Sequence, residues 1–170
     1  GSYTVTFTDG CNESVTSTID FTPMTNVVIS PECREDGIFM TANIGGDTMG
    51  VVSYEWSTGQ IGDTFKEIMV PSIGEYNVTI TDYCMVPVSA TLDFNPTPSS
   101  VTLDSECNDG MITIYADAET NTGILNYEWS NDEEGENLDS INVTPGEYMV
   151  TITDYCRLEA SASILFEPVA

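Results

Sequence analysis

Five cysteines carry the most distinctive chemistry in this sequence, and their context divides them into two classes. Cys11, Cys84 and Cys156 each follow an Asp by two positions. Cys33 and Cys107 each directly follow a Glu and precede an Asp-Gly pair. No Cys-x-x-Cys pair occurs, so neither a thiolate zinc site nor a dithiol redox motif is indicated. We therefore expect structural disulfides and an oxidising, extracellular compartment.

The charge of the chain is strongly one-sided, with 3 Lys and Arg against 28 Asp and Glu and a formal net charge of −25. Such a chain repels phosphate backbones and anionic membrane surfaces, which excludes nucleic acid and membrane surfaces as partners. Two interpretations remain. The acids keep the chain soluble and free of self-association, or they bind a divalent cation such as Ca²⁺, which prefers oxygen ligands.

The candidate calcium ligands are the acids that recur beside the cysteines in equivalent positions. They are Glu32, Asp36, Asp82, Glu106, Asp109 and Asp154. The alternative for the same residues is turn chemistry, because Asp-Gly favours a tight turn and Asp caps the end of a strand. We expect no cofactor other than Ca²⁺.

The sequence contains few of the residue patterns that are typical of catalytic sites. No His is present, which removes His-based triads and the commonest zinc ligand. No glycine-rich phosphate loop occurs, and no nucleophile has a base beside it. No segment has the ~20 consecutive apolar residues of a membrane-spanning helix. The sequence predicts a protein that is not an enzyme and is not inserted in a membrane.

Three internal motifs share one period, which indicates a tandem repeat. The segment Gly-x-Tyr-x-Val-Thr-x-Thr-Asp-x-Cys occurs at residues 1–11, 74–84 and 146–156. Tyr-Glu-Trp-Ser occurs at 54–57 and 127–130, so its copies are 127 − 54 = 73 residues apart. The two Glu-Cys segments repeat at nearly the same distance. We expect repeats at residues 25–97 and 98–170, preceded at 1–24 by the C-terminal hairpin of another repeat.

Apolar and polar residues alternate within each repeat, as half-buried antiparallel strands require. In the first repeat the expected strands are Val27–Ser30, Ile38–Ile44, Ser53–Trp56, Phe65–Val70, Gly74–Asp82 and Val88–Phe94. Short strands at this spacing predict an all-β fold of tandem Ig-like or PKD-like antiparallel β-sandwiches. Trp56 and Trp129 should lie in the two cores, and Tyr76 and Tyr148 occupy the place of a tyrosine corner.

The leading segment 1–24 cannot bury its apolar face as a lone hairpin. We expect it to belong to a longer array of repeats. The alternative is that it complements another subunit by strand addition.

Two disulfide arrangements are compatible with the repeat. In the first, Cys33–Cys84 and Cys107–Cys156 form within repeats, and Cys11 pairs with a residue upstream. In the second, Cys33 of one repeat pairs with Cys156 of the next, because an Ig-like strand order places the two classes of turn at opposite ends of a sandwich.

The motifs Tyr-x-Trp-Ser, Gly-x-Tyr-x-Val-Thr-Ile-Thr-Asp and Cys followed by Asp-Gly resemble the SprB-type repeats of gliding-motility adhesins of Bacteroidota. Two segments depart from that pattern. The usual Gly-Gly-x-Pro-Tyr is replaced by GGDTMGVVSYEW and TNTGILNYEW, and the usual Asp-x-x-Gly-Cys turn is shortened to Asp-Tyr-Cys. The resemblance implies type IX secretion, a cell-surface location, a structural or adhesive role, and O-glycans at Thr48 and Ser140.

These observations predict a stalk or spacer of a secreted bacterial surface adhesin or filament, connected with adhesion or gliding. Its partners would be neighbouring repeats of the same chain, with a surface or glycan ligand bound through other domains. One alternative is a glycan- or protein-binding Ig-like module that uses loops such as Asp132–Glu136. Another is a filament subunit that exchanges the leading hairpin between chains.

Overall fold

A computed structural model describes residues 1–20, 26–46, 50–108 and 111–167. This part of the chain is all-β: every regular element is a strand, and the strand pairs are antiparallel. The described residues contain no helix that could cross a membrane. The predicted fold class is confirmed.

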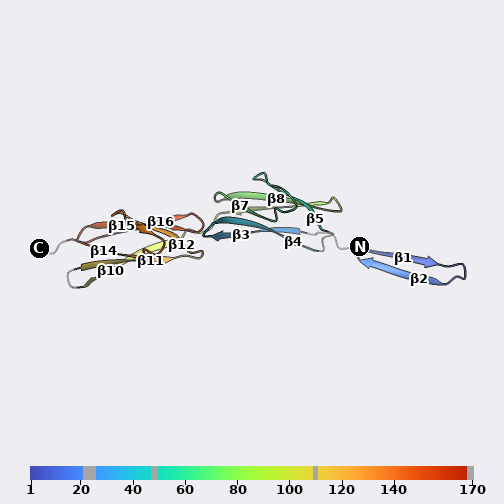
Figure 1. The fold of residues 1–170 in the computed structure, drawn as a ribbon, viewed down its shortest axis with the longest axis horizontal. Helices are drawn as coiled ribbons and strands as arrows, with labels where there is room; N and C mark the ends of the chain where they lie inside the picture. Colours follow the sequence, from blue (N-terminus) through green and yellow to red (C-terminus); the bar gives the residue numbers. More distant parts are fainter. Residues whose placement is uncertain (21–25, 47–49, 109–110, 168–170) are drawn as a thin grey trace. The chain divides into compact units, whose positions relative to one another are not determined.

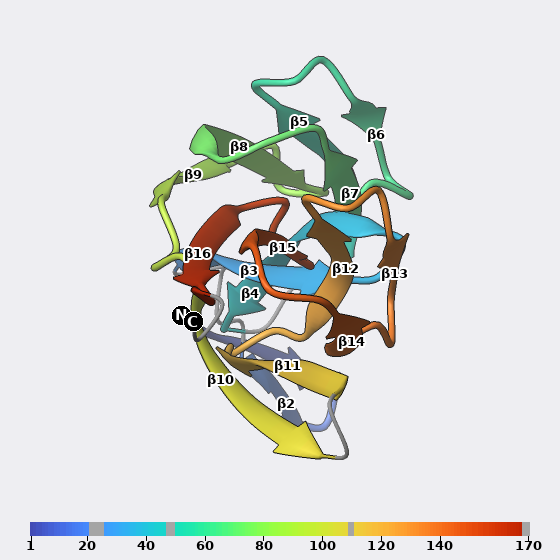
Figure 2. The same ribbon diagram turned by 90° about the vertical axis from the view of Figure 1, so that its left-hand side faces the viewer.

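The second repeat consists of two antiparallel sheets (Figures 1 and 2). One has the order β10-β11-β14, formed by Ser100–Asn108, Met111–Glu119 and Ser140–Val143. The other has the order β13-β12-β15-β16, formed by Glu134–Gly135, Ile124–Trp129, Glu147–Asp154 and Glu159–Leu165. Three strands in one sheet and four in the other is an Ig-like arrangement.

The first repeat has the same strand order. Its smaller sheet is β3-β4-β7, formed by Asn26–Arg34, Gly37–Gly45 and Glu67–Val70. Its larger sheet is β6-β5-β8-β9, formed by Ile61–Gly62, Val51–Trp56, Gly74–Asp82 and Pro87–Phe94. The 73-residue sequence period therefore reproduces one topology.

The two tryptophans lie in equivalent positions at the centres of the two cores. Trp56 and Trp129 are each 2% exposed. Each indole Nε1 donates to a backbone carbonyl: Trp56 to Phe65 at 2.7 Å, and Trp129 to Leu138 at 2.9 Å. A buried indole is satisfied only by such a partner, so each ring also ties down the loop that follows its strand.

The two candidate corner tyrosines lie at the start of β8 and β15. The Tyr148 hydroxyl donates to the Thr144 carbonyl at 3.0 Å, four residues upstream, which is the bond of a tyrosine corner. Tyr76 is buried at the equivalent place in β8.

Several strand limits differ from expectation, among them the end of β3 and the start of β7. β3 continues through Pro31 to Arg34, where the sequence pointed to an end at Ser30. Pro31 is tolerated because β3 is an edge strand of its sheet, where a missing backbone N–H need not break the ladder. β7 begins at Glu67, after Phe65 has given its carbonyl to the Trp56 indole.

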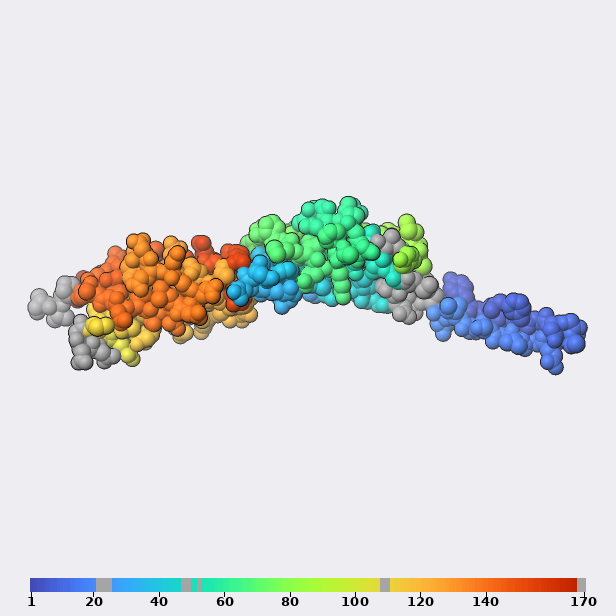
Figure 3. Space-filling view, in the orientation of Figure 1, coloured from blue at the N-terminus to red at the C-terminus, as the bar shows by residue number. Residues whose placement is uncertain are grey.

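The leading hairpin pairs β1 (Ser2–Thr8) with β2 (Ser14–Asp20). Its surface is dark blue in Figure 3. Tyr3 lies opposite Ile19 and Phe7 opposite Val15, the same register that places Tyr148 opposite Ile164 in β15–β16. In β15 this face is buried in the core, whereas Phe7 and Val15 are each 75% exposed.

Backbone contacts divide the chain into two compact units. One comprises residues 1–30, 40–68 and 75–93, and the other residues 31–39, 69–74 and 94–170. The β3–β4 turn and the strand ends beside it, residues 31–39, therefore belong to the same compact unit as the second repeat.

Burial of two core tyrosines predicts a loss of stability at alkaline pH. Burial raises the pKa of Tyr54 and of Tyr127 above the usual 10.0, and the carboxylates of Asp139 and Asp117 raise that of Tyr127 further. The unfolded chain then ionises first, so the free energy of unfolding should fall as the pH rises above 10.0. Urea titrations of wild type and the Tyr127→Phe variant, below and above that pH, would measure this.

The Tyr127→Phe variant should lose less stability than the wild type in that range. Tyr3→Phe is the matched control, because it also removes one tyrosine hydroxyl but at a side chain that is 65% exposed. Identical alkaline profiles for Tyr127→Phe and the wild type would contradict the prediction.

Candidate functional site

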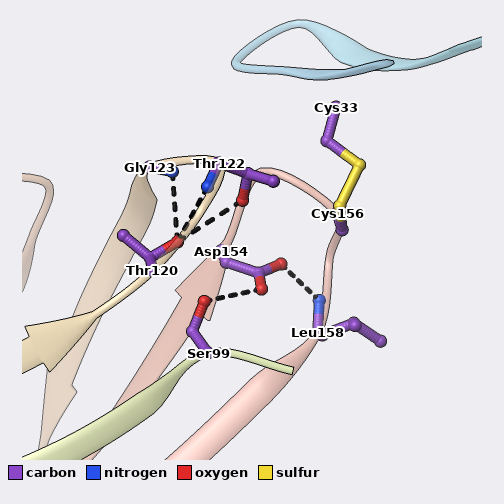
Figure 4. Close-up of a disulfide and its surroundings, with 8 residues drawn as sticks. All are labelled: Cys33, Ser99, Thr120, Thr122, Gly123, Asp154, Cys156 and Leu158. Carbon is purple, nitrogen blue, oxygen red and sulfur yellow. Dashed lines mark hydrogen bonds between the residues drawn. A yellow bond between two sulfur atoms is a disulfide. The ribbon is translucent and has the colours of Figure 1, made fainter. Parts of the chain in front are cut away.

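A disulfide joins Cys33 to Cys156, with a Cα–Cα distance of 5.0 Å and a sequence separation of 123 residues. Cys33 is the penultimate residue of β3, and Cys156 lies in the turn between β15 and β16. The bond therefore connects the β3–β4 turn of the first repeat to the β15–β16 turn of the second (Figure 4). Both cysteines lie within one compact unit of the chain.

The within-repeat pairing, Cys33–Cys84 and Cys107–Cys156, is wrong, because Cys33 and Cys156 are bonded to each other. The physical reason is visible in the second repeat. Ser99, just before β10, donates to Asp154, just before the β15–β16 turn, at 2.8 Å. Cys107 lies eight residues further along β10, about 26 Å away at the rise of a strand. A disulfide requires Cα atoms within about 7 Å, so the two cysteines of one repeat cannot meet.

The β15–β16 turn that holds Cys156 is built on the carboxylate of Asp154. This residue is 2% exposed. Its Oδ1 accepts from the backbone N–H of Leu158 at 3.0 Å, and its Oδ2 accepts from the Ser99 hydroxyl at 2.8 Å. Its carbonyl accepts from the Arg157 N–H at 2.9 Å. The carboxylate thus fixes the turn on one side and attaches it to the start of β10 on the other.

The same turn occurs in the other two copies. Asp82 accepts from the backbone N–H of Cys84 at 2.9 Å, and Asp9 accepts from that of Cys11 at 2.9 Å. The residue after each cysteine has a positive φ: 62° for Asn12, 58° for Met85 and 62° for Arg157. Three Asp-x-Cys segments therefore form one turn, which we call the Asp-Cys turn.

The left-handed residue of the Asp-Cys turn was not foreseen. Only Asn12 is of a type enriched in that conformation, whereas Met85 and Arg157 give no such signal. The hydrogen bonds of the preceding Asp hold the turn closed and so impose the conformation on whatever residue follows the Cys.

A tyrosine before the cysteine supports the turn in both complete repeats. The Tyr155 N–H donates to the Gly123 carbonyl at 3.1 Å, and a Cβ on Gly123 would lie 2.7 Å from the Tyr155 ring. Gly50 approaches Tyr83 equally closely, with 2.8 Å for a Cβ. Both glycines have φ near +100°, at +110° and +95°, which a side chain would strain.

The Gly123 loop is itself held by a side chain. The Thr120 hydroxyl accepts from the N–H groups of Thr122 and Gly123 at 3.1 and 3.2 Å (Figure 4). The leading hairpin has Gly10 in place of the tyrosine, and a Cβ on Gly10 would meet no atom of the rest of the chain within 4 Å.

A second interaction accompanies the disulfide. The Arg157 guanidinium donates to the Glu35 carbonyl at 3.0 Å, so the residue after Cys156 binds the turn that follows Cys33. Arg34, the last residue of β3, pairs with Glu32 at 2.6 Å, and its guanidinium lies 4.3 Å from the centre of the Phe39 ring. Two of the three basic side chains of the whole chain are thus placed at this bond.

The predicted calcium ligands do not converge where they are described. Asp82 and Asp154 are buried in Asp-Cys turns, Glu32 is paired with Arg34, and Asp36 is exposed. Glu106 is also exposed, and Asp109 lies outside the described residues. Within the described ranges, no three Cys, Asp or Glu side chains gather closely enough to hold a metal ion.

The other predicted residues are the remaining cysteines and the two candidate glycan sites. Cys11, Cys84 and Cys107 are free thiols with exposed side chains. Ser140 begins β14 and is half-buried, while Thr48 lies outside the described residues.

The buried Asp154 carboxylate should contribute strongly to stability. Asp154→Ala removes the acceptor of the Leu158 N–H and of the Ser99 hydroxyl, and should lower the free energy of unfolding by about 1–3 kcal/mol. Urea unfolding followed by tryptophan fluorescence would measure it. Asp9→Ala is the matched control, because the same turn is exposed there and water replaces the lost bonds. Equal midpoints for the two variants would contradict the role of burial.

No protein-family model matches the chain, and no curated protein sequence matches it. Among solved structures, the chain is similar to an amphioxus IgVJ-C2 molecule, with a TM-score of 0.36 and 14% identity, covering 85% of this chain and 98% of that one. It is also similar to a tetra-tandem repeat from the extending region of a large adhesion protein, with a TM-score of 0.31 and 15% identity. That match covers 96% of this chain and 55% of the other.

Proposed function

We propose that this chain is a load-bearing spacer: a tandem Ig-like segment of an extracellular surface protein in which disulfides between successive repeats prevent extension. The surface protein would be an adhesin or a surface filament. The resemblance to SprB-type repeats extends the proposal to a protein of Bacteroidota, exported by the type IX system and serving adhesion or gliding.

The observation that carries the proposal is the covalent path through the Cys33–Cys156 bond. The bond closes residues 34–155 into a ring that contains most of both repeats. Force applied at the two ends of the chain passes from Cys33 directly to Cys156 and leaves the ring unloaded. A spacer needs a covalent path that keeps force away from its folded repeats, whereas a binding module that presents loops does not.

Two further features support a spacer. Both tryptophans and both supported Asp-Cys turns occupy equivalent positions, so the repeats are alike in core and turn. The acidic surface, with a net charge of −25, opposes self-association of closely spaced repeats.

Single-molecule force spectroscopy on the chain, held at its two ends, tests the proposal. The oxidised chain should extend only through the residues outside the ring. Adding a reductant should release a further roughly 430 Å, for the separation of 123 residues at about 3.5 Å per residue.

Cys33→Ser is the matched control, because it should show the full extension with or without reductant. Cys84→Ser should behave as the wild type, since Cys84 is free. An oxidised wild type that extends as far as Cys33→Ser would contradict a load-bearing role.

The leading hairpin favours a second candidate, a filament subunit that exchanges strands. Its apolar face, with Phe7 and Val15 each 75% exposed, matches in register a hairpin that is buried in the second repeat. The face would then be covered by the smaller sheet of another chain. Light scattering across a concentration series tests this: exchange requires dimers or longer species, and a monomer at every concentration would contradict it.

A further inference from the structure

We propose that Cys107 and Cys84 are the two halves of a further bridge of the Cys33–Cys156 kind, formed between two copies of this chain. Cys107 of one copy bonds Cys84 of the next, which continues the same connection from repeat to repeat. The inference rests on the spacer function, and it adds that each repeat is bonded to both of its neighbours.

The pairing rule comes from the bond already present. A cysteine near the end of the first strand of one repeat bonds the Asp-Cys turn of the following repeat. Cys107 occupies the place of Cys33: each is the eighth residue of a nine-residue strand, β10 or β3. Cys84 occupies the place of Cys156 in the Asp-Cys turn. By the same rule Cys107 requires a following repeat and Cys84 a preceding one.

The Asp-Cys turn that contains Cys84 is already ordered by its own hydrogen bonds and packing. The Asp82 carboxylate holds the N–H groups of Cys84 and Val86 at 2.9 and 3.4 Å, and Tyr83 packs against Gly50. The Asp154 bond to the Leu158 N–H and the packing of Tyr155 against Gly123 hold Cys156 in a similar way, yet Cys156 is 3% exposed and Cys84 is exposed. The two cysteines differ in exposure because Cys156 is bonded to Cys33, whereas Cys84 is a free thiol.

Cys11 is a poorer partner for Cys107 although it belongs to the same class. Its turn has Gly10 where the tyrosine stands in the other two copies, and a Cβ on Gly10 would meet no atom within 4 Å. The geometry therefore points to Cys84.

The consequence for an array is two interleaved series of bonds. A bond from Cys84 to the preceding repeat and a bond from Cys107 to the following repeat are 107 − 84 = 23 residues apart along the chain. The shortest covalent path therefore includes one such segment for every two repeats, and this segment contains β9 and most of β10. An array bonded in this way can be lengthened by unfolding only within these short segments.

The reaction is thiol–disulfide exchange. One thiolate attacks a small-molecule disulfide such as oxidised glutathione, giving a mixed disulfide and one released thiol. The second cysteine thiolate then attacks the mixed disulfide and releases the second thiol. Two cysteine thiols become one protein disulfide, and two molecules of reduced glutathione carry away the two electrons and two protons.

The test uses the full chain with Cys11→Ser, so that Cys84 and Cys107 are the free thiols and the Cys33–Cys156 bond is intact. Equal amounts of ¹⁵N-labelled and unlabelled chain are incubated at high concentration with a glutathione redox couple. About 1 M salt shortens the Debye length to ~3 Å and so screens the charge of −25 on each copy. After alkylation, mass spectrometry of the peptides identifies the bonds, and mixed labels identify those between copies.

We expect mixed-label Cys84–Cys107 peptides to exceed Cys84–Cys84 and Cys107–Cys107 together by about tenfold, a preference of about 1.4 kcal/mol. Random collision would give equal amounts of like and unlike pairs. Adding Cys84→Ser or Cys107→Ser should each reduce disulfide-linked oligomers on a non-reducing gel by about tenfold.

Random pairing, dimers as abundant in either variant as in the parent chain, or glutathione adducts alone would overturn the proposal. The force measurement above depends only on Cys33–Cys156. Its success alongside random pairing here would leave the spacer function standing and reject only this bridge.

Discussion

Replacing Trp129 with Ala should lower the free energy of unfolding of the second repeat by about 3–5 kcal/mol, as large-to-small changes at buried aromatic residues do. The indole is 2% exposed within a core that includes Ile114, Val150 and Ile152. The change opens a cavity and also leaves the Leu138 carbonyl without its Nε1 donor. Small domains have only about 5–15 kcal/mol in total, so much of this repeat's stability would be lost.

The chain allows the effect to be assigned to one repeat. Trp56 and Trp129 are its only tryptophans, so each Ala variant leaves one fluorophore that reports the other repeat. Unfolding of Trp129→Ala is followed by circular dichroism for the whole chain and by Trp56 fluorescence for the first repeat.

Trp129→Phe is the control, because it keeps much of the apolar volume and should lose less. Trp56→Ala should show the equivalent loss in the first repeat. A Trp129→Ala variant with the wild-type midpoint would contradict the placement of this side chain at the centre of the core.

Opening the Cys33–Cys156 bond should lower the free energy of unfolding by about 2–4 kcal/mol. A cross-link stabilises a protein mainly by limiting the unfolded chain, and the chain-entropy model gives up to about 4.7 kcal/mol for a loop near 100 residues. This loop spans 123 residues. The Arg157–Glu35 hydrogen bond should also weaken when the two turns are free to separate.

Guanidinium unfolding of Cys33→Ser, compared with wild type in the absence and presence of a reductant, measures the contribution. Reduced wild type should match Cys33→Ser. Cys84→Ser and Cys107→Ser are matched controls, since both residues are exposed and unbonded within one copy, and each should change the stability by less than about 0.5 kcal/mol. A loss in the controls as large as that in Cys33→Ser would show that the bond is not the cause.

Much of the fold could be read from local patterns. The alternation of Tyr148, Val150 and Ile152 with polar residues indicates a strand with one buried face, and in the structure Val150 and Ile152 are fully buried. The two copies of Tyr-Glu-Trp-Ser place both tryptophans at one position of one topology. Such predictions succeed because side-chain alternation and repeat period are properties of neighbouring residues along the chain.

The disulfide pairing at the candidate site depends on distances in space between cysteines, and no local sequence pattern gives those distances. The sequence left Cys33 two partners, Cys84 or Cys156, and only the folded chain chooses between them. The bond that formed is between repeats because β10 and its equivalent β3 separate the two cysteines of a repeat by the length of a strand. The left-handed residues after the cysteines were hidden for a related reason, since the Asp carboxylate imposes them.

The sequence alone predicts the strands, the repeat, the core residues and the two classes of cysteine, because each of these depends on residue type and spacing. Which cysteine meets which, and which carboxylates close turns, was settled only by the tertiary structure. Those outcomes depend on which ends of the strands lie together in space, and the sheets must be assembled before any two turns can meet.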